Sequence, residues 1–507
     1  MKAFLMHSDR DFALEAELPS QERALMQDLE LETLLEAMAA GDGLIFEVAK
    51  RALLVSLRDP DEIVYRQRVL TDCLAHPEVM RELYNLAGEA LQAEKSVWGS
   101  IRHSPGTSLN SSVQKMELFV GFLRQLRDLA DTQAKNFSSP GLIRLFEMLQ
   151  EELDDGYFEL VTGYLETLKF NNGMLMSAAL TAGNKGRDYT LRRPREQGLL
   201  ERVFDRSGYS FTIPERDDNG FRALSDLEDK GLNLVANALA QAVDHVHSFF
   251  VMLRVEVGFY VGCVNLSERL AELGATTALP LASGHDELVL SAQGLYDVCL
   301  RLTTREPVVG NELSADGKSL VMITGANQGG KSTFLRSIGL AQLMTQCGMF
   351  VGADSLQMNA CDGIFTHYKR EEDETMESGK LDEELARMSE IADHIAPHCL
   401  LLCNESFAST NEREGSQIAR QVVTALLEAR VKVVFVTHMF DLASGFYRQH
   451  FDTALFLRAE RGPEGARPFT ISEGEPLPTS YGEDSYRKIF GKEIAGGPAA
   501  MPDSRRG

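Results

Sequence analysis

The feature that most constrains this chain is a glycine-rich segment between an apolar run and a helix-like run. Residues 319–324 (SLVMIT) have the composition of a buried strand, and residues 334–344 continue with the spacing of a helix. Strand, G-x-x-x-x-G-K-S and helix are the context that a phosphate-binding loop requires. The plainer interpretation, a glycine-rich turn with a chance lysine, does not explain both flanking elements.

Each position in this loop has an expected role. The predicted nucleotide-binding residues are Gly325, Ala326, Asn327, Gln328, Gly329, Gly330, Lys331, Ser332 and Thr333. The glycines let backbone amides close around a phosphate, and the following helix directs its positive N-terminal end at the same anion. Lys331 is expected to contact the β- and γ-phosphates, and Ser332 to ligate Mg²⁺. The loop therefore predicts ATP and Mg²⁺ as cofactors.

Two further apolar runs end in polar residues of the kind that such a site uses. Residues 400–405 form one such run, which ends in Asn404 and Glu405, and Val433–Val436 is followed by Thr437 and His438. Asn404 can accept a hydrogen bond from Mg²⁺-bound water but brings no negative charge, and Glu405 is placed to act as a general base. His438 is interpreted as a sensor of the γ-phosphate, although a lone histidine is often structural.

Together these residues resemble the ATPase domain of the MutS family of DNA mismatch repair proteins. The family's G-P-N-x-G-G-K-S-T is matched by residues 325–333, and its I-F-T-R by residues 364–367, with His367 in place of arginine. Its D-E-x-x-x-x-T, T-H-x-x-x-L and S-Y-G are matched by residues 404–410, 437–442 and 480–482. The resemblance covers roughly residues 29–492 and implies lever helices leading into an ABC-type ATPase that dimerises across its nucleotides.

The resemblance also implies a residue that acts across the dimer interface. Glu377-Ser378-Gly379-Lys380 is similar to the family's S-G loop, in which a serine faces the partner's γ-phosphate. Ser378 is thus a further candidate nucleotide-binding residue. The residues that follow it are acidic, which is unfavourable beside a triphosphate unless they are paired. The alternative is an exposed loop that leads into a helix at residues 385–395.

The remaining sequence predicts a helical domain followed by an α/β domain, an α + α/β fold class. A short leader is expected at residues 1–28, a helical core and lever domain at 29–274, and a P-loop ATPase domain at 275–492. The helical domain has a small basic insert at about 171–221, with a β-like run at Tyr209–Ile213, and a long helix from Arg222 to Leu273. Residues 493–507 are expected to be a disordered tail.

Some parts of the family pattern are not expected in this chain. About 28 residues precede the lever region, which leaves no room for the N-terminal mismatch-reading domain and its connector. The C-terminal helix-turn-helix that supports the dimer is also not expected after Gly482. Recognition of a mispaired base by the usual route is therefore not predicted.

DNA binding requires local positive charge, because the net charge of the chain is −24. The one dense basic segment lies in the insert, and its candidate DNA-contacting residues are Lys185, Arg187, Arg192, Arg193 and Arg195. Such residues neutralise phosphates without reading bases, which favours structure-guided binding. The alternative is a solvated loop whose cations are balanced by neighbouring acids such as Asp188 and Glu196.

Composition indicates a cytoplasmic protein without a membrane segment. No apolar run approaches the roughly 20 residues that span a bilayer, and acidic residues interrupt the N-terminus. The seven cysteines are scattered without a C-x-x-C pair, which argues against a disulfide framework or a zinc site. Cys399 and Cys403 flank an apolar run and are interpreted as small core residues rather than redox-active ones.

The leading prediction is an ATPase that couples hydrolysis to binding duplex or branched DNA in repair or recombination, acting as a homodimer, with turnover slowed by Asn404. The alternative is a nucleotide-gated protein-interaction module of ABC-ATPase type with weak hydrolysis. The acidic net charge suggests a protein partner in that case.

Overall fold

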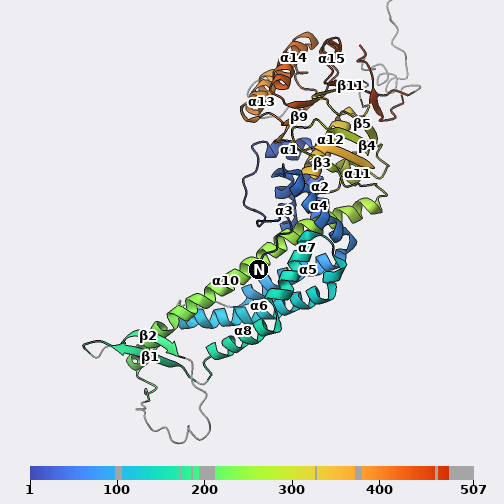
Figure 1. The fold of residues 1–507 in the computed structure, drawn as a ribbon. Coiled ribbons are helices and arrows are strands. Elements are labelled where there is room, and N and C mark those ends of the chain that lie inside the picture. Colours follow the sequence, from blue (N-terminus) through green and yellow to red (C-terminus); the bar gives the residue numbers. More distant parts are fainter. Residues whose placement is uncertain are drawn as a thin grey trace, which may run out of the picture. The chain divides into compact units, whose positions relative to one another are not determined.

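The computed structural model describes residues 1–97, 105–171, 173–183, 186–192, 212–325, 328–370, 379–462 and 466–478 (Figure 1). The chain forms two compact units. The first, called the helical unit, combines Met1–Phe12 with His76–Gly258. The second, called the sheet unit, combines Ala13–Ala75 with the described residues from Phe259 onward.

The helical unit is built from long helices. They are α5 (Pro77–Ser96), α6 (Pro105–Gln133), the short 3₁₀ helix η1 (Ala134–Asn136), α7 (Pro140–Glu152), α8 (Asp155–Leu168) and, up to Gly258, α10 (Asp218–Glu272). Three of them begin at a proline, which suits a first helical turn because the missing N–H has no helical partner there. The 55 residues of α10 correspond to about 80 Å of helix. The predicted long helix is therefore present and begins at Asp218.

The first twelve residues belong to the core of the helical unit. Leu5 and Met6 are fully buried, and the buried carboxylate of Glu256 on α10 accepts backbone hydrogen bonds from Leu5, Met6 and Phe12. Charge-assisted bonds of this kind are stronger than neutral ones. The structure thus places the beginning of the predicted leader inside a packed core.

A β-hairpin lies between α8 and α10. Its strands, β1 (Leu175–Leu180) and β2 (Gly186–Arg192), pair in antiparallel fashion. The β-like run predicted at Tyr209–Ile213 is wrong at its two described residues, because Thr212 and Ile213 form no strand. Residues 209–211 lie outside the described residues.

The sheet unit contains two sheets and nine helices besides the end of α10, counted over its described residues. The helices are α1 (Glu22–Asp28), α2 (Leu31–Ala39), α3 (Gly43–Leu54), α4 (Pro60–Ala75), α11 (Val298–Thr303), α12 (Lys331–Gln346), α13 (Lys380–His394), α14 (Glu412–Glu428) and α15 (Phe440–Tyr447). The strands are β3 (Leu281–Ser283), β4 (Leu290–Leu295), β5 (Asn311–Ser314), β6 (Leu320–Gly325), β7 (Ser355–Asn359), β8 (Ile364–Tyr368), β9 (Leu400–Asn404), β10 (Lys432–Val436), β11 (Ala454–Ala459) and β12 (Ile471–Glu473).

The larger sheet brings the predicted site strands together. Its order is β12-β11-β6-β10-β9-β8, with every neighbouring pair parallel except β11 and β12. The smaller sheet has the order β3-β7-β4-β5. Because β6, β9 and β10 run in the same direction, their carboxyl ends lie at one edge of the larger sheet.

Residues 13–75 join the sheet unit because α12 is buried almost throughout its length. A helix that is apolar on most of its surface needs covering on several faces. A side chain at Gly339 would lie 2.7 Å from atoms of both Leu29 and Leu402, so this helix packs tightly between the N-terminal segment and β9. The sequence analysis instead assigned residues 13–28 to a leader and residues 29–75 to the helical domain, with a boundary near residue 275. In the structure the division falls within α10, after Gly258.

Helix α10 has a longer apolar stretch than the sequence analysis expected. Among the described residues, it is the one helix long and apolar enough to cross a membrane, and 78% of its apolar window is buried within the protein. A buried core helix meets the same criteria of length and composition. The seven cysteines are all buried free thiols, and the core positions predicted for Cys399 and Cys403 are confirmed.

Candidate nucleotide site

The loop between β6 and α12 has a backbone that demands its glycines. Gly325 has φ 106°, and an added Cβ there would lie 2.8 Å from the backbone of Ala459 on β11. Gln328 and Gly330 also adopt positive φ, at 58° and 90°. Such angles favour glycine, and successive backbone amides in curved turns of this kind can bind an anion. Ala326 and Asn327 lie outside the described residues.

Lys331 opens α12 and folds back over this loop. Its side chain is largely buried, and Nζ donates a hydrogen bond to the Gly325 carbonyl oxygen at 3.1 Å. Burial lowers the pKa of Lys331, and the nearby Glu405 carboxylate opposes that shift. A cation held beside a curved loop of backbone amides provides the charge that an oligophosphate requires.

Ser332, the residue after Lys331, brings its hydroxyl oxygen on α12 next to the amide oxygen of Asn404 on β9. Ser332 on α12 donates its hydroxyl hydrogen to Oδ1 of Asn404 at 2.9 Å, and Asn404 is the last residue of β9. The neighbouring Thr333 continues the first turn of α12. Hydroxyl and amide oxygens are hard ligands, the type that Mg²⁺ and its bound waters prefer.

Glu405 and His438 form a second pair at the same edge. Glu405 follows β9 with φ 54°, and its backbone N–H donates to the Val436 carbonyl at the end of β10. Its Oε2 accepts hydrogen bonds from the His438 backbone N–H at 3.1 Å and from Nδ1 at 2.5 Å. The hydrogen bond to Glu405 raises the pKa of His438. A carboxylate and an imidazole are therefore coupled beside Lys331.

A cavity of about 370 Å³ adjoins the loop. Its lining includes Gly329, Gly330 and Lys331 together with three aromatic residues, Tyr296, Phe334 and Phe469. Aromatic rings beside a phosphate-binding loop suit a planar base. The sequence analysis missed Tyr296 and Phe469 because no local motif marks them.

Asn311 holds Phe469 at the cavity. Its side chain donates to the Phe469 carbonyl at 3.2 Å and accepts from the Ile471 backbone N–H at 2.7 Å. Asn311 begins β5 of the smaller sheet and Phe469 precedes β12 of the larger one. The cavity wall is thus assembled from residues 158 positions apart.

His367 lies behind the site rather than in it. It is fully buried, its Nε2 lies 3.0 Å from the Glu384 carbonyl, and its Nδ1 lies 2.7 Å from Ser406 Oγ. A carbonyl only accepts hydrogen bonds, so Nε2 carries the hydrogen. Burial lowers the pKa of His367 to about 4, which keeps the ring neutral. This neutral ring links α13 to the residue that follows Glu405.

The acidic run at the start of α13 includes one buried carboxylate. Glu384 is buried and accepts a hydrogen bond from the Ser409 hydroxyl at 3.0 Å. Burial raises the pKa of Glu384, with that bond acting in the opposite direction. Ser378, the residue predicted to act across an interface, lies outside the described residues.

Two of the five predicted DNA-contacting residues are described, both on β2. The side chain of Arg187 is 66% exposed and lies 3.2 Å from the Asp188 carboxylate. Arg192 Nε donates to Ser177 Oγ at 2.8 Å. The other three, Lys185, Arg193 and Arg195, lie outside the described residues.

Comparison with known proteins matches two separate regions of the chain. Residues 58–273 match the family model described as MutS2 N-terminal domain, and residues 321–466 match MutS domain V. The chain is 25% identical to MutS protein homolog 4 of Mus musculus over 264 residues, which are 50% of this chain and 26% of that protein.

Bacterial relatives match at slightly higher identity. The chain is 30% identical over 217 residues to DNA mismatch repair protein MutS of Synechococcus sp. (strain CC9902), covering 40% of this chain and 24% of that protein. It is 32% identical over 162 residues to DNA mismatch repair protein MutS of Chloroflexus aurantiacus (strain ATCC 29366 / DSM 635 / J-10-fl), covering 31% and 17%. The matched part of the chain thus spans no more than about a third of the length of these relatives.

Proposed function

Because the chain belongs to the MutS family, we propose that it is an ATPase of ABC type that couples ATP hydrolysis to DNA binding. Its DNA would be duplex or branched, in repair or recombination, and its working form a homodimer across the nucleotide sites. The observation that carries this proposal is the meeting of Lys331, Asn404, Glu405 and His438 at the carboxyl ends of the parallel strands β6, β9 and β10.

The phosphates of ATP would lie in the loop from Gly325 to Lys331, and the base in the adjoining cavity against Phe469. The positive φ angles and the tight packing at Gly325 support this assignment, because a backbone-lined cradle excludes side chains. Ala326, Asn327 and Thr333 would complete the cradle.

Ser332 and Asn404 fit a Mg²⁺ site by their chemistry. Both present neutral oxygen atoms, and the two side chains are in direct contact. When bound, the ion would neutralise phosphate charge. Asn404 would act through hydrogen bonds to the ion's water ligands, without adding a negative charge.

Glu405 is the proposed general base, with His438 controlling it. In the structure the Glu405 carboxylate accepts two hydrogen bonds from His438, so its lone pairs are partly engaged. A carboxylate that accepts from an imidazolium is a weaker base. We therefore infer that His438 must release Glu405, for example by turning toward a γ-phosphate, before a water can be deprotonated.

The exposed hairpin strand β2 is the proposed DNA contact, with Arg187 and Arg192 as its described cations. Lys185, Arg193 and Arg195 extend the same basic segment in sequence. Phosphate contacts of this type carry no base readout.

A second candidate function follows from Asn404, which stands where a carboxylate is expected. It is a nucleotide-gated protein-interaction module in which ATP drives dimerisation and turnover is slow. Replacing Asn404 by aspartate would then increase turnover, since a negative charge would strengthen the Mg²⁺ site. Unchanged turnover in Asn404→Asp would show that the missing charge does not limit the rate.

Steady-state ATP turnover with Mg²⁺ tests the main proposal, measured with and without duplex and branched DNA. Lys331→Ala is the control, because it removes the proposed phosphate contact. Turnover that depends on Lys331 and changes with DNA supports the proposal. Turnover that no DNA alters, or that is no higher than in the control, refutes the main proposal and favours the protein-interaction module.

A further inference from the structure

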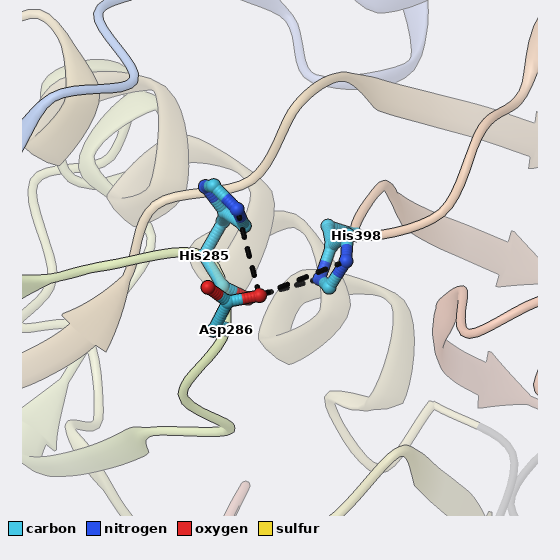
Figure 2. A group of neighbouring side chains, drawn as sticks. All are labelled: His285, Asp286 and His398. Carbon is cyan, nitrogen blue, oxygen red and sulfur yellow. Dashed lines mark hydrogen bonds and ion pairs between the residues drawn. The ribbon is translucent and has the colours of Figure 1, made fainter.

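A second cluster of metal-binding side chains lies on two loops of the sheet unit (Figure 2). His285 and Asp286 come from the loop between β3 and β4, and His398 from the loop between α13 and β9. Their ligand atoms all lie within 4.8 Å of one another. Figure 2 shows the Asp286 carboxylate directed at both imidazole rings.

The spacing of the ligand atoms matches a single small ion. His285 Nε2 lies 3.5 Å and His398 Nε2 lies 3.9 Å from Asp286 Oδ1. A tetrahedral zinc ion with bonds of about 2.0–2.1 Å holds its ligands about 3.4 Å apart. The cluster needs only a small contraction to reach that geometry.

The hydrogen bond at His398 leaves the correct nitrogen available. Its Nδ1 lies 3.2 Å from the backbone carbonyl oxygen of His285, which can only accept. The hydrogen is therefore on Nδ1, and the lone pair of the neutral ring is on Nε2, the atom that faces Asp286. Histidine ligands of metal ions commonly direct their second nitrogen at a carbonyl in this way.

The backbone at His398 is also held in place. Its φ is 65°, an uncommon conformation for a residue other than glycine. The His398 N–H donates to the Arg430 carbonyl at 2.9 Å, and the Asp362 N–H donates to the His398 carbonyl at 3.1 Å. These bonds fix the imidazole of His398 opposite the loop that carries the other two ligands.

We propose that His285, Asp286 and His398 bind one divalent transition-metal ion, with Zn²⁺ as the best match. Two imidazoles and one carboxylate form a borderline donor set that suits zinc rather than Mg²⁺. The side chains of His285 and Asp286 are 43% and 82% exposed, so water completes the coordination. The ion joins the β3–β4 loop to the start of β9.

This site is distinct from the nucleotide site and does not rest on the proposed function. His398 lies two residues before β9, whereas Asn404 is its last residue. At about 3.3 Å per strand residue, the two sites lie at opposite ends of β9, about 15 Å or more apart. The negative net charge of the chain attracts a cation from solution.

Zinc binding to the full chain tests the proposal, measured by equilibrium dialysis and metal analysis without nucleotide and with excess Mg²⁺. We expect one equivalent of Zn²⁺, and binding at least about tenfold weaker in His285→Ala and in His398→Asn. Asparagine tolerates the left-handed backbone, so His398→Asn removes the ring without adding strain. His394→Ala, an exposed histidine on α13, is the matched control and keeps the ion.

Replacement of zinc by Co²⁺ gives a second readout, because tetrahedral Co²⁺ absorbs visible light. The absorption should appear in the wild type and in His394→Ala, and be absent in His398→Asn. Wild-type protein that retains no zinc overturns the proposal, and so does equal binding by His398→Asn. Loss of the ion in Ser332→Ala would place it at the nucleotide site and overturn the proposal as well.

Discussion

The packing of Gly415 against the loop that carries Glu405 offers a sharp test of how the candidate base is held. Gly415 lies in the first turns of α14, and a Cβ added there would overlap the Phe407 carbonyl oxygen and lie 3.2 Å from Met439 Sδ. Phe407 is fully buried two residues after Glu405. Gly415→Ala must therefore displace either α14 or the loop.

The expected cost combines two opposing effects. Overpacking a well-packed site costs about 1–3 kcal/mol, and the upper half of that range applies because a backbone oxygen cannot rotate away. Replacing a helical glycine by alanine returns about 1 kcal/mol. The sheet unit should therefore lose about 1–2 kcal/mol of unfolding free energy in Gly415→Ala.

Urea unfolding measures this loss, with Gly43→Ala as the matched control. Gly43 begins α3 in the same unit, and a Cβ added there would meet no atom within 4 Å beyond its own helix and chain neighbours. The control should be unchanged or slightly more stable. If Gly415→Ala is as stable as Gly43→Ala, the close packing against Phe407 is not real and the reasoning fails.

The same variant separates nucleotide binding from hydrolysis. A displacement of a catalytic group by about 1 Å can reduce a rate about 100-fold. We therefore expect Gly415→Ala to bind ATP as the wild type does, because Lys331 follows a different strand, while turnover falls about 10- to 100-fold. A destabilised variant with full turnover would argue against Glu405 as the base.

Three further outcomes are expected. The pairing of His438 with Glu405 raises the pKa of His438 in the folded state. The pairing therefore stabilises the fold fully below the ordinary pKa of 6.5, and this stabilisation is lost as the pH rises through the folded-state pKa. Urea midpoints measured as a function of pH should show this loss in the wild type and not in Glu405→Gln. Replacing Arg187 and Arg192 by alanine should weaken DNA binding. The slope of log K against log salt concentration should decrease in magnitude by about 0.9 for each phosphate that is no longer neutralised. An unchanged slope would exclude β2 from the DNA interface. In Glu256→Gln the side-chain NH₂ would face a backbone N–H donor, which should lower the free energy of unfolding by about 1–3 kcal/mol. Amide hydrogen exchange in residues 1–12 should become faster, and unchanged exchange would show that the Glu256 carboxylate does not anchor these residues.

Local elements were predictable because their signals are local. The strand predicted at residues 400–405 is present as β9, which ends one residue earlier, at Asn404. The helix at Pro60 begins directly after Asp59, whose carboxylate accepts a hydrogen bond from the Asp61 N–H at 2.9 Å. Capping, proline geometry and apolar spacing each act within a few residues, so a single sequence carries them.

Contacts between segments far apart in the sequence decide which segments belong to each of the two units. Residues 13–75 pack against α12 through side chains such as Leu29, which no spacing rule connects to residue 339. The first twelve residues are anchored by Glu256, more than 240 positions away. Sequence patterns relate each segment only to its neighbours along the chain, and so the domain boundary was predicted elsewhere.

The sequence by itself predicted which residues would form a site, at the glycine-rich loop and at two strand ends. The tertiary structure alone decided which of them touch: Ser332 meets Asn404, and Glu405 meets His438. Those contacts follow from the sheet order β6-β10-β9, in which the strand latest in the chain lies in the middle. The cluster at His285 and His398, 113 positions apart, has the same origin. Strand order is set by the burial of whole elements, a free energy that no local pattern in the sequence expresses.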